Sequence, residues 1–356
     1  MTAAPERLLE LGWDDSWAEL AAACPTPGLP GRVTRVDRGV CTVMTEHGPV
    51  RASWSAALLD AAATDPTKAP CTGDWCVLCC WPDGPVTIHA VLDRRTAVTR
   101  AGSSRTSHAQ VLVANVDVIA VVVALHPEPN ISRIERLVTL AWESDARPVV
   151  ALTKADLVPD AAGIAAEVRQ ACPGVDVVTC STVTDEGLDE LRGLLGPNGT
   201  MGLIGASGHG KSSLTNALVG AEALATKAIR DDGKGRHTSV RRELVLLPGG
   251  GAVVDTPGLR GVGLHSASEG LASTFPDVED LAAQCKFRNC SHGGEPGCAI
   301  RAAVSTGELS QRRLDSWFRL QRELAWIAAR SDARLHAEQV KKWKKITQDN
   351  RMRRDR

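Results

Sequence analysis

Eight consecutive residues, Gly205 to Ser212, follow the pattern G-x-x-x-x-G-K-S. Glycines in such a loop let successive backbone N–H groups turn inward on phosphate oxygens, because no Cβ stands in the way. The amine of Lys211 can then reach the outer phosphates of a nucleotide, and the hydroxyl of Ser212 can bind magnesium. The apolar run 200–204 predicts a strand before the loop, and 213–219 predicts a helix whose N-terminus favours an anion. A chance glycine-rich turn would lack this context, so the segment predicts a nucleoside triphosphate site.

A second phosphate-related motif, D-x-x-G, begins at Asp255 and ends at Gly258. It follows the apolar run 252–254, which predicts that the carboxylate lies at the end of a strand. From there Asp255 can hold magnesium through water, and the N–H of Gly258 can contact the terminal phosphate. The polar segment between the two motifs contains Gly-Arg-His-Thr-Ser at 235–239 and has the composition of a mobile switch. In it Thr238, or the serine that follows, can be a further magnesium ligand.

Residues that could select the base follow two other apolar runs. In Thr153-Lys154-Ala155-Asp156, the Asp156 carboxylate can accept hydrogen bonds from both N1–H and the exocyclic amine of guanine, a pair that adenine does not offer. The stem of Lys154 can lie over the base. Backbone N–H groups around Ser181 could meet guanine O6. Each motif is weak alone. Together they predict a guanine nucleotide, because open α/β sheets bind ligands at the carboxyl ends of their strands.

The candidate residues therefore fall into overlapping groups. Lys211 and Asp255 are predicted to act in catalysis, and Ser212, Thr238 and Asp255 to bind magnesium. The predicted nucleotide-binding residues are Thr153, Lys154, Ala155, Asp156, Ser181, Gly205, Ala206, Ser207, Gly208, His209, Gly210, Lys211, Ser212, Ser213, Thr238 and Gly258.

A separate cluster of metal-ligand residues has the form Cys285-x4-Cys290-x-His292-x5-Cys298. Three thiolates and one imidazole at short spacings predict a closed tetrahedral zinc site, which is structural rather than catalytic. The alternative is four unrelated residues in a glycine-rich loop. Zinc would hold together a segment too small for a sufficient core of its own, and we expect a helix over 309–329 to pack around it.

The elements that must position the nucleotide site are indicated by the hydrophobic pattern. Apolar strands are predicted at 116–125, 148–153, 176–181 and 200–204, and helices at 131–142, 161–171 and 188–195. Strands that are apolar along their whole length are buried on both faces. The pattern therefore predicts a mostly parallel, doubly wound sheet covered by helices.

The first hundred residues show a different pattern. Residues 1–30 predict a short amphipathic helix followed by a Pro/Gly linker. Short alternating strands at 32–43, 72–81 and 86–92, with a turn at Gly48-Pro49, predict a small β-barrel of the oligonucleotide-binding type. Cysteines gather in this part of the chain, but neighbours in a strand point to opposite faces, so we expect core positions rather than a metal site for Cys71, Cys76, Cys79 and Cys80.

Stacking aromatic residues are scarce, because the chain has no Tyr and three Phe. RNA binding by the barrel would have to use Trp54, Trp75 or Trp81, although a buried position is equally expected for each. The cations available to it are Arg32, Arg35, Arg38, Arg94, Arg95 and Arg100.

Composition and charge limit the class of protein. The 356 residues suffice for two or three domains. The formal net charge is −1, but residues 341–356 carry +6 and the remainder −7. Such a basic tail favours a polyanionic partner, with a solvated disordered end as the alternative. Eleven cysteines without a secretory leader predict a reducing, cytoplasmic location. The most apolar run, 116–125, is too short to span a bilayer, so no membrane partner is expected.

The order of the motifs is unusual. An ordinary GTPase has the phosphate loop first and the base-reading motifs last, whereas here the base-reading motifs come first. The order, the metal motif and the sequences T-K-A-D, G-A-S-G-H-G-K-S-S, G-R-H-T-S and D-T-P-G-L resemble the RsgA family, the circularly permuted small-ribosomal-subunit biogenesis GTPases. The resemblance extends over about residues 31–335.

The resemblance implies a multidomain α/β protein. Its segments would be an N-terminal helical extension and linker (1–30), an OB-fold barrel (31–104), a circularly permuted GTPase domain (105–262), a zinc-binding helical domain (263–335) and a basic tail (336–356). The family's activity is hydrolysis of GTP to GDP in late maturation of the 30S subunit, with binding to 16S rRNA and stimulation by the subunit. We expect a monomer with one structural zinc and with magnesium bound beside GTP.

Leu259 stands after D-x-x-G, where water-orienting GTPases have Gln, so slow hydrolysis is expected of the free protein. His237, the family's switch histidine, is the candidate for positioning the water, and Arg236 or a ribosomal arginine could offset charge. The alternative is that His237 only folds the switch. Because the chain runs from D-x-x-G directly into the zinc domain, we expect phosphate-dependent movement to pull on 263–335.

One departure from the usual pattern bears on selectivity. Thr153 stands where the base-reading motif usually has Asn, which removes an amide that braces the loop and makes Asp156 the main determinant of guanine selectivity. Two other functions fit parts of the sequence. An RNA-binding module could use nucleotide as a stabilising ligand with little turnover, and an ATP-dependent kinase could share the phosphate loop.

Overall fold

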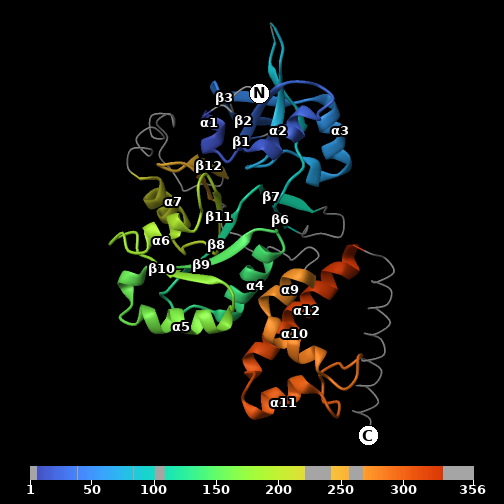
Figure 1. Cartoon of the computed structure of the whole chain (residues 1–356), viewed down its shortest axis with the longest axis vertical. Coiled ribbons are helices and arrows are strands. Elements are labelled where there is room, and N and C mark those ends of the chain that lie inside the picture. The colour runs from blue at the N-terminus through green and yellow to red at the C-terminus, as the bar shows by residue number, and fades with distance from the viewer. Residues whose placement is uncertain are drawn as a thin grey trace.

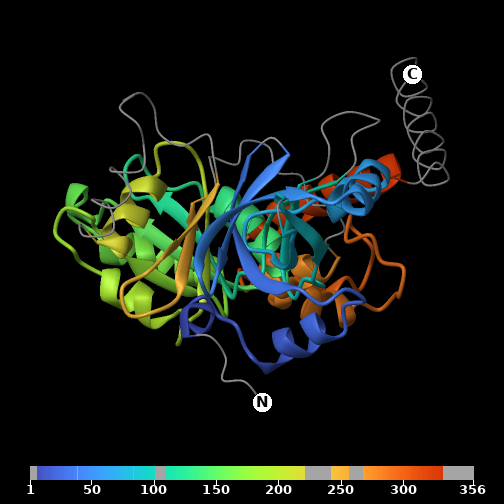
Figure 2. The same ribbon diagram turned by 90° about the horizontal axis from the view of Figure 1, so that it is seen from above.

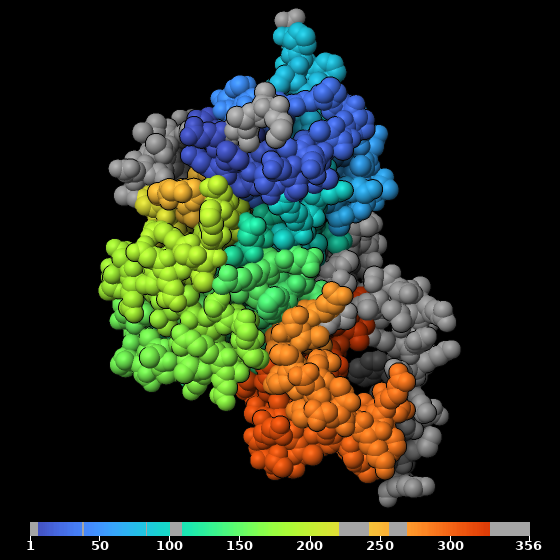
Figure 3. Space-filling view, in the orientation of Figure 1, coloured from blue at the N-terminus to red at the C-terminus, as the bar shows by residue number. Residues whose placement is uncertain are grey.

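The computed structural model describes residues 6–37, 39–82, 84–100, 109–220, 242–255 and 268–331. Along the chain it forms a barrel, a sheet domain and a helical module (Figure 1). The space-filling view shows the blue barrel and the orange helical module at opposite ends of the green sheet domain (Figure 3).

Five strands make the barrel: β1 (Leu29–Asp37), β2 (Val40–Thr45), β3 (Gly48–Trp54), β4 (Trp75–Cys80) and β5 (Val86–Val91). Their order is β1-β2-β3-β5-β4, and β4 pairs back with β1, so the blue strands curl into a closed cylinder (Figure 2). Inward side chains such as Val33, Cys41 and Ile88 fill its core. The predicted barrel of the oligonucleotide-binding type is therefore confirmed.

Two details of the barrel differ from the sequence-based expectation. Gly48 and Pro49 do not form the turn but begin β3, where they pair with Thr45 and Met44. A helix that was not expected, α3 (Ala56–Thr64), follows β3 and is capped by the Ser55 hydroxyl, and it is followed by the short helix η1 (Pro66–Lys68). Neither of these two helices is marked by strong apolar periodicity in the sequence.

The N-terminal segment forms two helices, α1 (Glu6–Glu10) and α2 (Asp15–Ala22), rather than one. Gly12 separates them with φ +89°, a conformation that favours glycine and ends a helix. Asp14 then starts α2, because its carboxylate accepts a hydrogen bond from the Trp17 N–H at 3.0 Å.

This segment covers Trp75 at the base of the barrel. The rings of Trp13 and Trp17 lie 4.9 and 6.0 Å from that of Trp75, which is 1% exposed. The Arg32 guanidinium also lies over this ring, 5.0 Å from its centre. Trp75 is therefore a core residue and has no surface for RNA.

Arg32 also joins the barrel to the sheet domain. It is 1% exposed and donates to the Asn115 carbonyl at 2.6 Å and the Thr200 hydroxyl at 2.8 Å. In addition β1 pairs with the edge of the sheet domain at Arg35 and Glu243. A buried guanidinium that satisfies backbone carbonyls of both parts holds them together as one unit.

The sheet domain is built on five parallel strands in the order β10-β9-β8-β11-β13, with β12 antiparallel at the edge. Their bounds are β8 (Val118–Ala124), β9 (Arg147–Thr153), β10 (Asp176–Thr179), β11 (Thr200–Ile204), β12 (Glu243–Leu246) and β13 (Ala252–Asp255). A hairpin of β6 (Ala97–Arg100) and β7 (Gln110–Ala114) connects it to the barrel.

Helices cover both faces of this sheet. α4 (Ile131–Trp142) and α5 (Ala161–Ala171) pack on one face, and α6 (Leu188–Gly193) and α7 (Lys211–Val219) on the other. Consecutive residues of one strand, such as Val121 and Val122, belong to different cores, as expected of strands buried on both sides. The predicted doubly wound sheet is confirmed.

The helical module comprises α9 (Ser268–Thr274), α10 (Pro276–Ala283), α11 (Ala299–Thr306) and α12 (Gln311–Ser331). It is anchored to α4 by a buried charge cluster. Glu135, fully buried, accepts from Arg313 at 3.0 Å, Arg312 at 3.1 Å and the Ser316 hydroxyl at 2.6 Å. Removing one partner from such a buried charge cluster typically costs about 3–5 kcal/mol of stability. The cluster therefore holds the module firmly against α4.

Candidate nucleotide site and metal centre

The parallel sheet brings the sequence-predicted nucleotide motifs to one edge. The base-reading segment follows β9, the phosphate loop follows β11, and Asp255 ends β13. Because β9 and β11 both pair with β8 in parallel and β13 pairs in parallel with β11, the carboxyl ends of these strands lie along one edge of the sheet. The inverted order along the chain is therefore compatible with a single cleft.

The phosphate loop is shaped by its glycines and by the end of β8. Gly205 has φ +152°, and a Cβ there would lie 2.3 Å from the Val122 carbonyl oxygen, so no larger residue fits. Lys211 is 7% exposed, and its amine donates to the Gly205 and Ala206 carbonyls at 3.1 and 2.9 Å. Burial lowers the pKa of this amine and Asp255 opposes that shift. The loop thus holds a cation ready for phosphate.

The predicted magnesium ligands meet at the start of α7. The Ser212 hydroxyl donates to one carboxylate oxygen of Asp255 at 2.7 Å. The other oxygen, Oδ1, is buried and has no hydrogen-bond partner among the described residues. A buried carboxylate oxygen without a donor is suited to a hydrated cation, so these two residues fit magnesium. Thr238 lies outside the described residues.

Thr153 ties the base-reading segment to the phosphate loop. Its hydroxyl donates to the His209 carbonyl at 2.7 Å, and the His209 ring lies 3.2 Å from the Val122 carbonyl. Because Thr153 replaces the usual Asn, a brace of the loop was expected to be lost, but the Thr153 hydroxyl makes one. Burial lowers the pKa of His209, and the cations Arg133 and Lys211 add to the effect.

Replacing Thr153 by Val tests this brace. The change keeps the side-chain shape but leaves the partly buried His209 carbonyl without its donor, at a cost of about 1–3 kcal/mol. We expect the affinity for GDP to fall roughly 5- to 150-fold, measured by calorimetric titration. Thr153→Asn, which restores a donor, is the control. Wild-type affinity in the Val variant would show that the loop does not depend on Thr153.

The Ser181 hydroxyl acts on Asp156. It donates to Asp156 Oδ1 at 2.6 Å and accepts from the backbone N–H groups of Val183 and Thr184 at 3.1 and 3.3 Å. Ser181 is fully buried, whereas Asp156 is exposed on η2 (Ala155–Leu157). Ser181 therefore orients the carboxylate that would read the base. The sequence did not indicate the roles of Val183 and Thr184, because backbone donors leave no residue-type signal.

The remaining parts of the cleft connect these motifs. The Ala155 N–H donates to the Cys180 carbonyl at 3.2 Å, which holds the two base-reading segments together, and Lys154 adopts a left-handed conformation with φ +61°. A groove of about 730 Å³ lies between the segment 182–192 and α7, and it reaches the base-reading segment at Thr182 and the phosphate loop at Ser213. Ser207 and Gly208 are exposed at the top of the phosphate loop, and Gly210 precedes α7 with φ +86°. His237 and Gly258 lie outside the described residues.

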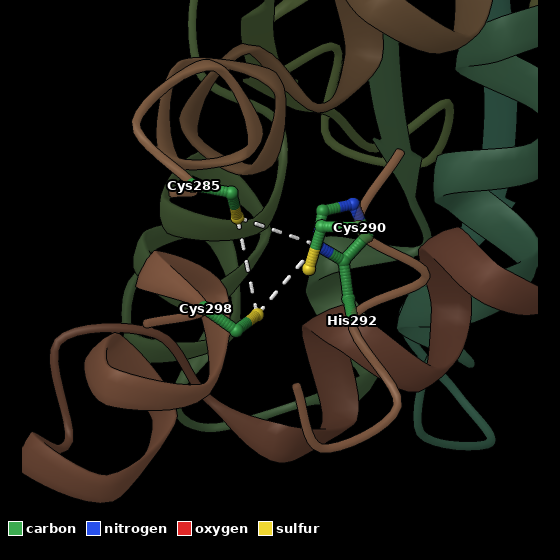
Figure 4. A group of neighbouring side chains, drawn as sticks. All are labelled: Cys285, Cys290, His292 and Cys298. Carbon is green, nitrogen blue, oxygen red and sulfur yellow. Dashed lines mark hydrogen bonds between the residues drawn. The ribbon is translucent and has the colours of Figure 1, made fainter. Parts of the chain in front are cut away.

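The four predicted metal ligands come together in the helical module (Figure 4). The His292 Nδ1 atom lies 3.5 Å from the Cys285 sulfur and 3.6 Å from the Cys298 sulfur, and those sulfurs are 3.9 Å apart. All four ligand atoms, including the Cys290 sulfur, lie within 4.8 Å of one another. A tetrahedral zinc with typical bond lengths would place them about 3.5–3.8 Å apart. The cluster therefore fits a tetrahedral ion of this kind.

The loop around the metal ligands is organised by Glu295, which sequence reasoning missed. Its carboxylate accepts from the N–H groups of Ser291 and Gly293, both at 2.9 Å, and of Gly294 at 3.1 Å. His292 sits between them with φ +58°, and its ring packs 5.7 Å from Trp317 of α12. Of the barrel cysteines for which core positions were expected, Cys71 and Cys76 are buried, whereas Cys79 is half-buried and Cys80 is exposed, so the expectation is wrong for Cys80.

The structure shows which of the barrel's candidate RNA contacts are already paired or buried and which are exposed. Arg94 is occupied by the buried Asp74 at 2.7 Å, and Arg95 pairs with Asp14 at 2.6 Å. Trp54 is half-buried, with its indole N–H directed to the Cys41 sulfur at 3.3 Å. Trp81 is 56% exposed at the end of β4 and is thus the candidate that offers a stacking surface. Arg38 and the side chain of Arg100 lie outside the described part.

Comparisons with known proteins agree with the site. The RsgA GTPase family model matches residues 91–265. The small ribosomal subunit biogenesis GTPase RsgA of Streptomyces coelicolor is 48% identical over 95% of this chain and 92% of its own length. The protein of the same name from Opitutus terrae is 41% identical over 97% of each.

Two solved structures are also similar. YjeQ from Thermotoga maritima is 27% identical, with a TM-score of 0.62 over 83% of this chain and 98% of that one. YloQ, described as a circularly permuted GTPase, is 25% identical, with a TM-score of 0.56 over 83% and 94% of the two chains. Among the described helices, none combines the length and apolar character needed to cross a bilayer.

Proposed function

The chain belongs to the RsgA family of GTP-hydrolysing enzymes, and from this premise we propose that it hydrolyses GTP during maturation of the small ribosomal subunit. The observation that carries the proposal is the hydrogen bond from Thr153 to the His209 carbonyl. It joins the base-reading segment to the phosphate loop, so one guanine nucleotide can contact Asp156 and Lys211 together. A kinase for adenine nucleotides would have no use for the oriented carboxylate of Asp156.

Each end of the nucleotide has its own group of residues in this proposal. Lys154 and Asp156 hold the guanine, Ser181 fixes the Asp156 carboxylate, and the backbone of 205–213 binds the phosphates. Magnesium, when bound by Ser212 and Asp255, would neutralise charge on the phosphates. Thr238 and Gly258 are proposed to complete this end of the site.

Hydrolysis requires a group that orients water, and Leu259 cannot do so. We assign this role to His237, with charge offset by Arg236 or by an arginine of the subunit. Because the free chain lacks the glutamine that orients water in other GTPases, its own turnover would be slow. The small subunit then acts as activator, which confines hydrolysis to the time when the chain is bound.

The partners follow from the barrel, the module and the names of the relatives. Streptomyces coelicolor RsgA is named for small ribosomal subunit biogenesis, and we assign the 30S subunit and its 16S rRNA to this chain as binding partners. The exposed Trp81 of the barrel supports contact with RNA. We further propose that the chain acts as a monomer in the cytoplasm and carries one structural zinc on Cys285, Cys290, His292 and Cys298.

Turnover with and without purified 30S subunits tests the function. We expect slow hydrolysis by the free protein and stimulation on the order of 10³-fold by the subunit, the lower end of what groups supplied in trans achieve in other GTPases. Lys211→Ala gives the background rate, and 50S subunits control for non-specific RNA. Subunit binding without added turnover would contradict the proposal and favour an RNA-binding module that keeps nucleotide as a stabiliser.

A further inference from the structure

The segment between the first two metal ligands presents an unusual set of side chains. Lys286, Phe287, Arg288 and Asn289 are all exposed. Of the chain's three phenylalanines, Phe275 is fully buried and Phe318 is half-buried, whereas Phe287 is 42% exposed. A single exposed apolar residue needs no explanation by itself. What distinguishes Phe287 is how firmly it is held and which charges surround it.

The backbone on both sides of Phe287 is fixed. Cys285 and Cys290 belong to the candidate metal cluster, and the Cys290 N–H donates to the Phe287 carbonyl at 3.1 Å. The Lys286 N–H donates to the Gly297 carbonyl at 3.1 Å, and a Cβ on Gly297 would lie 3.0 Å from the Lys286 Cβ. The ring is therefore presented from a rigid loop, so binding to it would cost little conformational entropy.

The surroundings of the ring are positively charged. The Lys286 ammonium lies 5.6 Å from the Phe287 ring centre, and Arg288 follows the ring in sequence. Within the described residues neither cation has an ion pair. Glu295, the acid of the same loop, is turned toward the backbone N–H groups of Ser291 and its neighbours. An exposed aromatic ring with one cation over it and a second cation next in sequence, on one short exposed loop, matches the chemistry of a nucleobase and its adjacent phosphates.

From these observations we propose that the Cys285–Cys290 loop is a stacking platform for one unpaired RNA base. Phe287 stacks on the base, and Lys286 and Arg288 bind the adjacent phosphates. The inference rests on the proposed function for its RNA partner and extends it by naming the contact residues of the helical module. The metal thereby acquires a second task, because it holds the platform rigid as well as the module folded.

The test compares full-length, zinc-loaded variants for binding to 30S subunits and to protein-free 16S rRNA, with a non-hydrolysable GTP analogue present. We expect Phe287→Ala to weaken binding to both about 5- to 150-fold, as loss of one base–aromatic stack does, and Phe287→Trp to preserve it. Leu59→Ala, which truncates a 49% exposed side chain on α3, is the matched control. Unchanged zinc content and thermal midpoint establish that the variants are folded.

The contribution of the two cations is tested separately. Lys286→Gln with Arg288→Gln should reduce the slope of log affinity against log salt by roughly 0.7 for each cation removed. If the Phe287→Ala variant bound both targets with wild-type affinity, the proposal of a stacking platform would be wrong. A loss confined to intact subunits shows a protein contact and overturns it as well. Failure of the wild-type chain to bind either target would instead count against the proposed function.

Discussion

Asp156→Asn is expected to exchange the preference of the site from guanine to xanthine. The carboxylate accepts two charge-assisted hydrogen bonds from guanine, each worth about 1.5–3 kcal/mol. An amide at this position offers a donor to the exocyclic amine of guanine, which is itself a donor. The affinity for GDP should therefore fall roughly 10²- to 10⁴-fold. Xanthine has a carbonyl oxygen in place of that amine and can accept from the amide.

Ser181 determines which way the new amide points. Its hydroxyl donates to Asp156 Oδ1 in the native chain, so in the variant it pairs with the amide oxygen and turns the NH₂ group toward the base. Xanthosine diphosphate should consequently bind the Asn variant more tightly than GDP does. Adding Ser181→Ala removes the orienting donor and should abolish most of that gain.

Competition of GDP, XDP and ADP against a fluorescent nucleotide measures this exchange. Asp156→Ala is the matched control, because it lacks both acceptor and donor and should bind none of them well. If the Asn variant kept its preference for GDP, the base would not lie against Asp156, and the assignment of the base-reading segment would be wrong.

Short-range signals in the sequence predicted much of this fold. The helices at 131–142 and 161–171 lie where their apolar periodicity predicts them, because an amphipathic helix is stable when its apolar face packs against the sheet. The phosphate loop was predicted from its glycines and its flanking strand and helix. The grouping of Cys285, Cys290, His292 and Cys298 was likewise predicted from their spacing, since candidate tetrahedral thiolate sites need little more than a short loop.

Contacts between distant segments could not be predicted. Thr153 and Glu135 look like ordinary strand and helix residues, and only the packing of the sheet shows that one meets His209 and the other Arg313. Trp75 offered the same ambiguity, because a tryptophan in a strand can face water or a neighbouring segment. Its burial depends on the N-terminal residues Trp13 and Trp17, which the sequence placed in one continuous helix.

Removing the metal is expected to unfold the helical module while nucleotide binding persists. Structural zinc supplies about 10–16 kcal/mol in small zinc domains, as much as the whole stability of a typical domain of 5–15 kcal/mol. The helices α9, α10 and α11 of the module are short, and His292 packs on Trp317 of the longer α12. Without the metal, α12 should detach from α4 and leave Glu135 without its partners. The phosphate loop contacts β8 and β9 instead, so GDP affinity should change little.

Cys298→Ser tests this dependence without a chelator, because it removes one ligand at a buried position. We expect metal content to fall from one zinc per chain to near zero, and amide exchange to rise sharply over 268–331 and over α4. Cys80→Ser, at an exposed barrel cysteine, is the control and should change neither. If protection across the module survived loss of the metal, the buried cluster around Glu135 would suffice to fold it. The metal would then serve the surface loop at Phe287 and not the core beneath it.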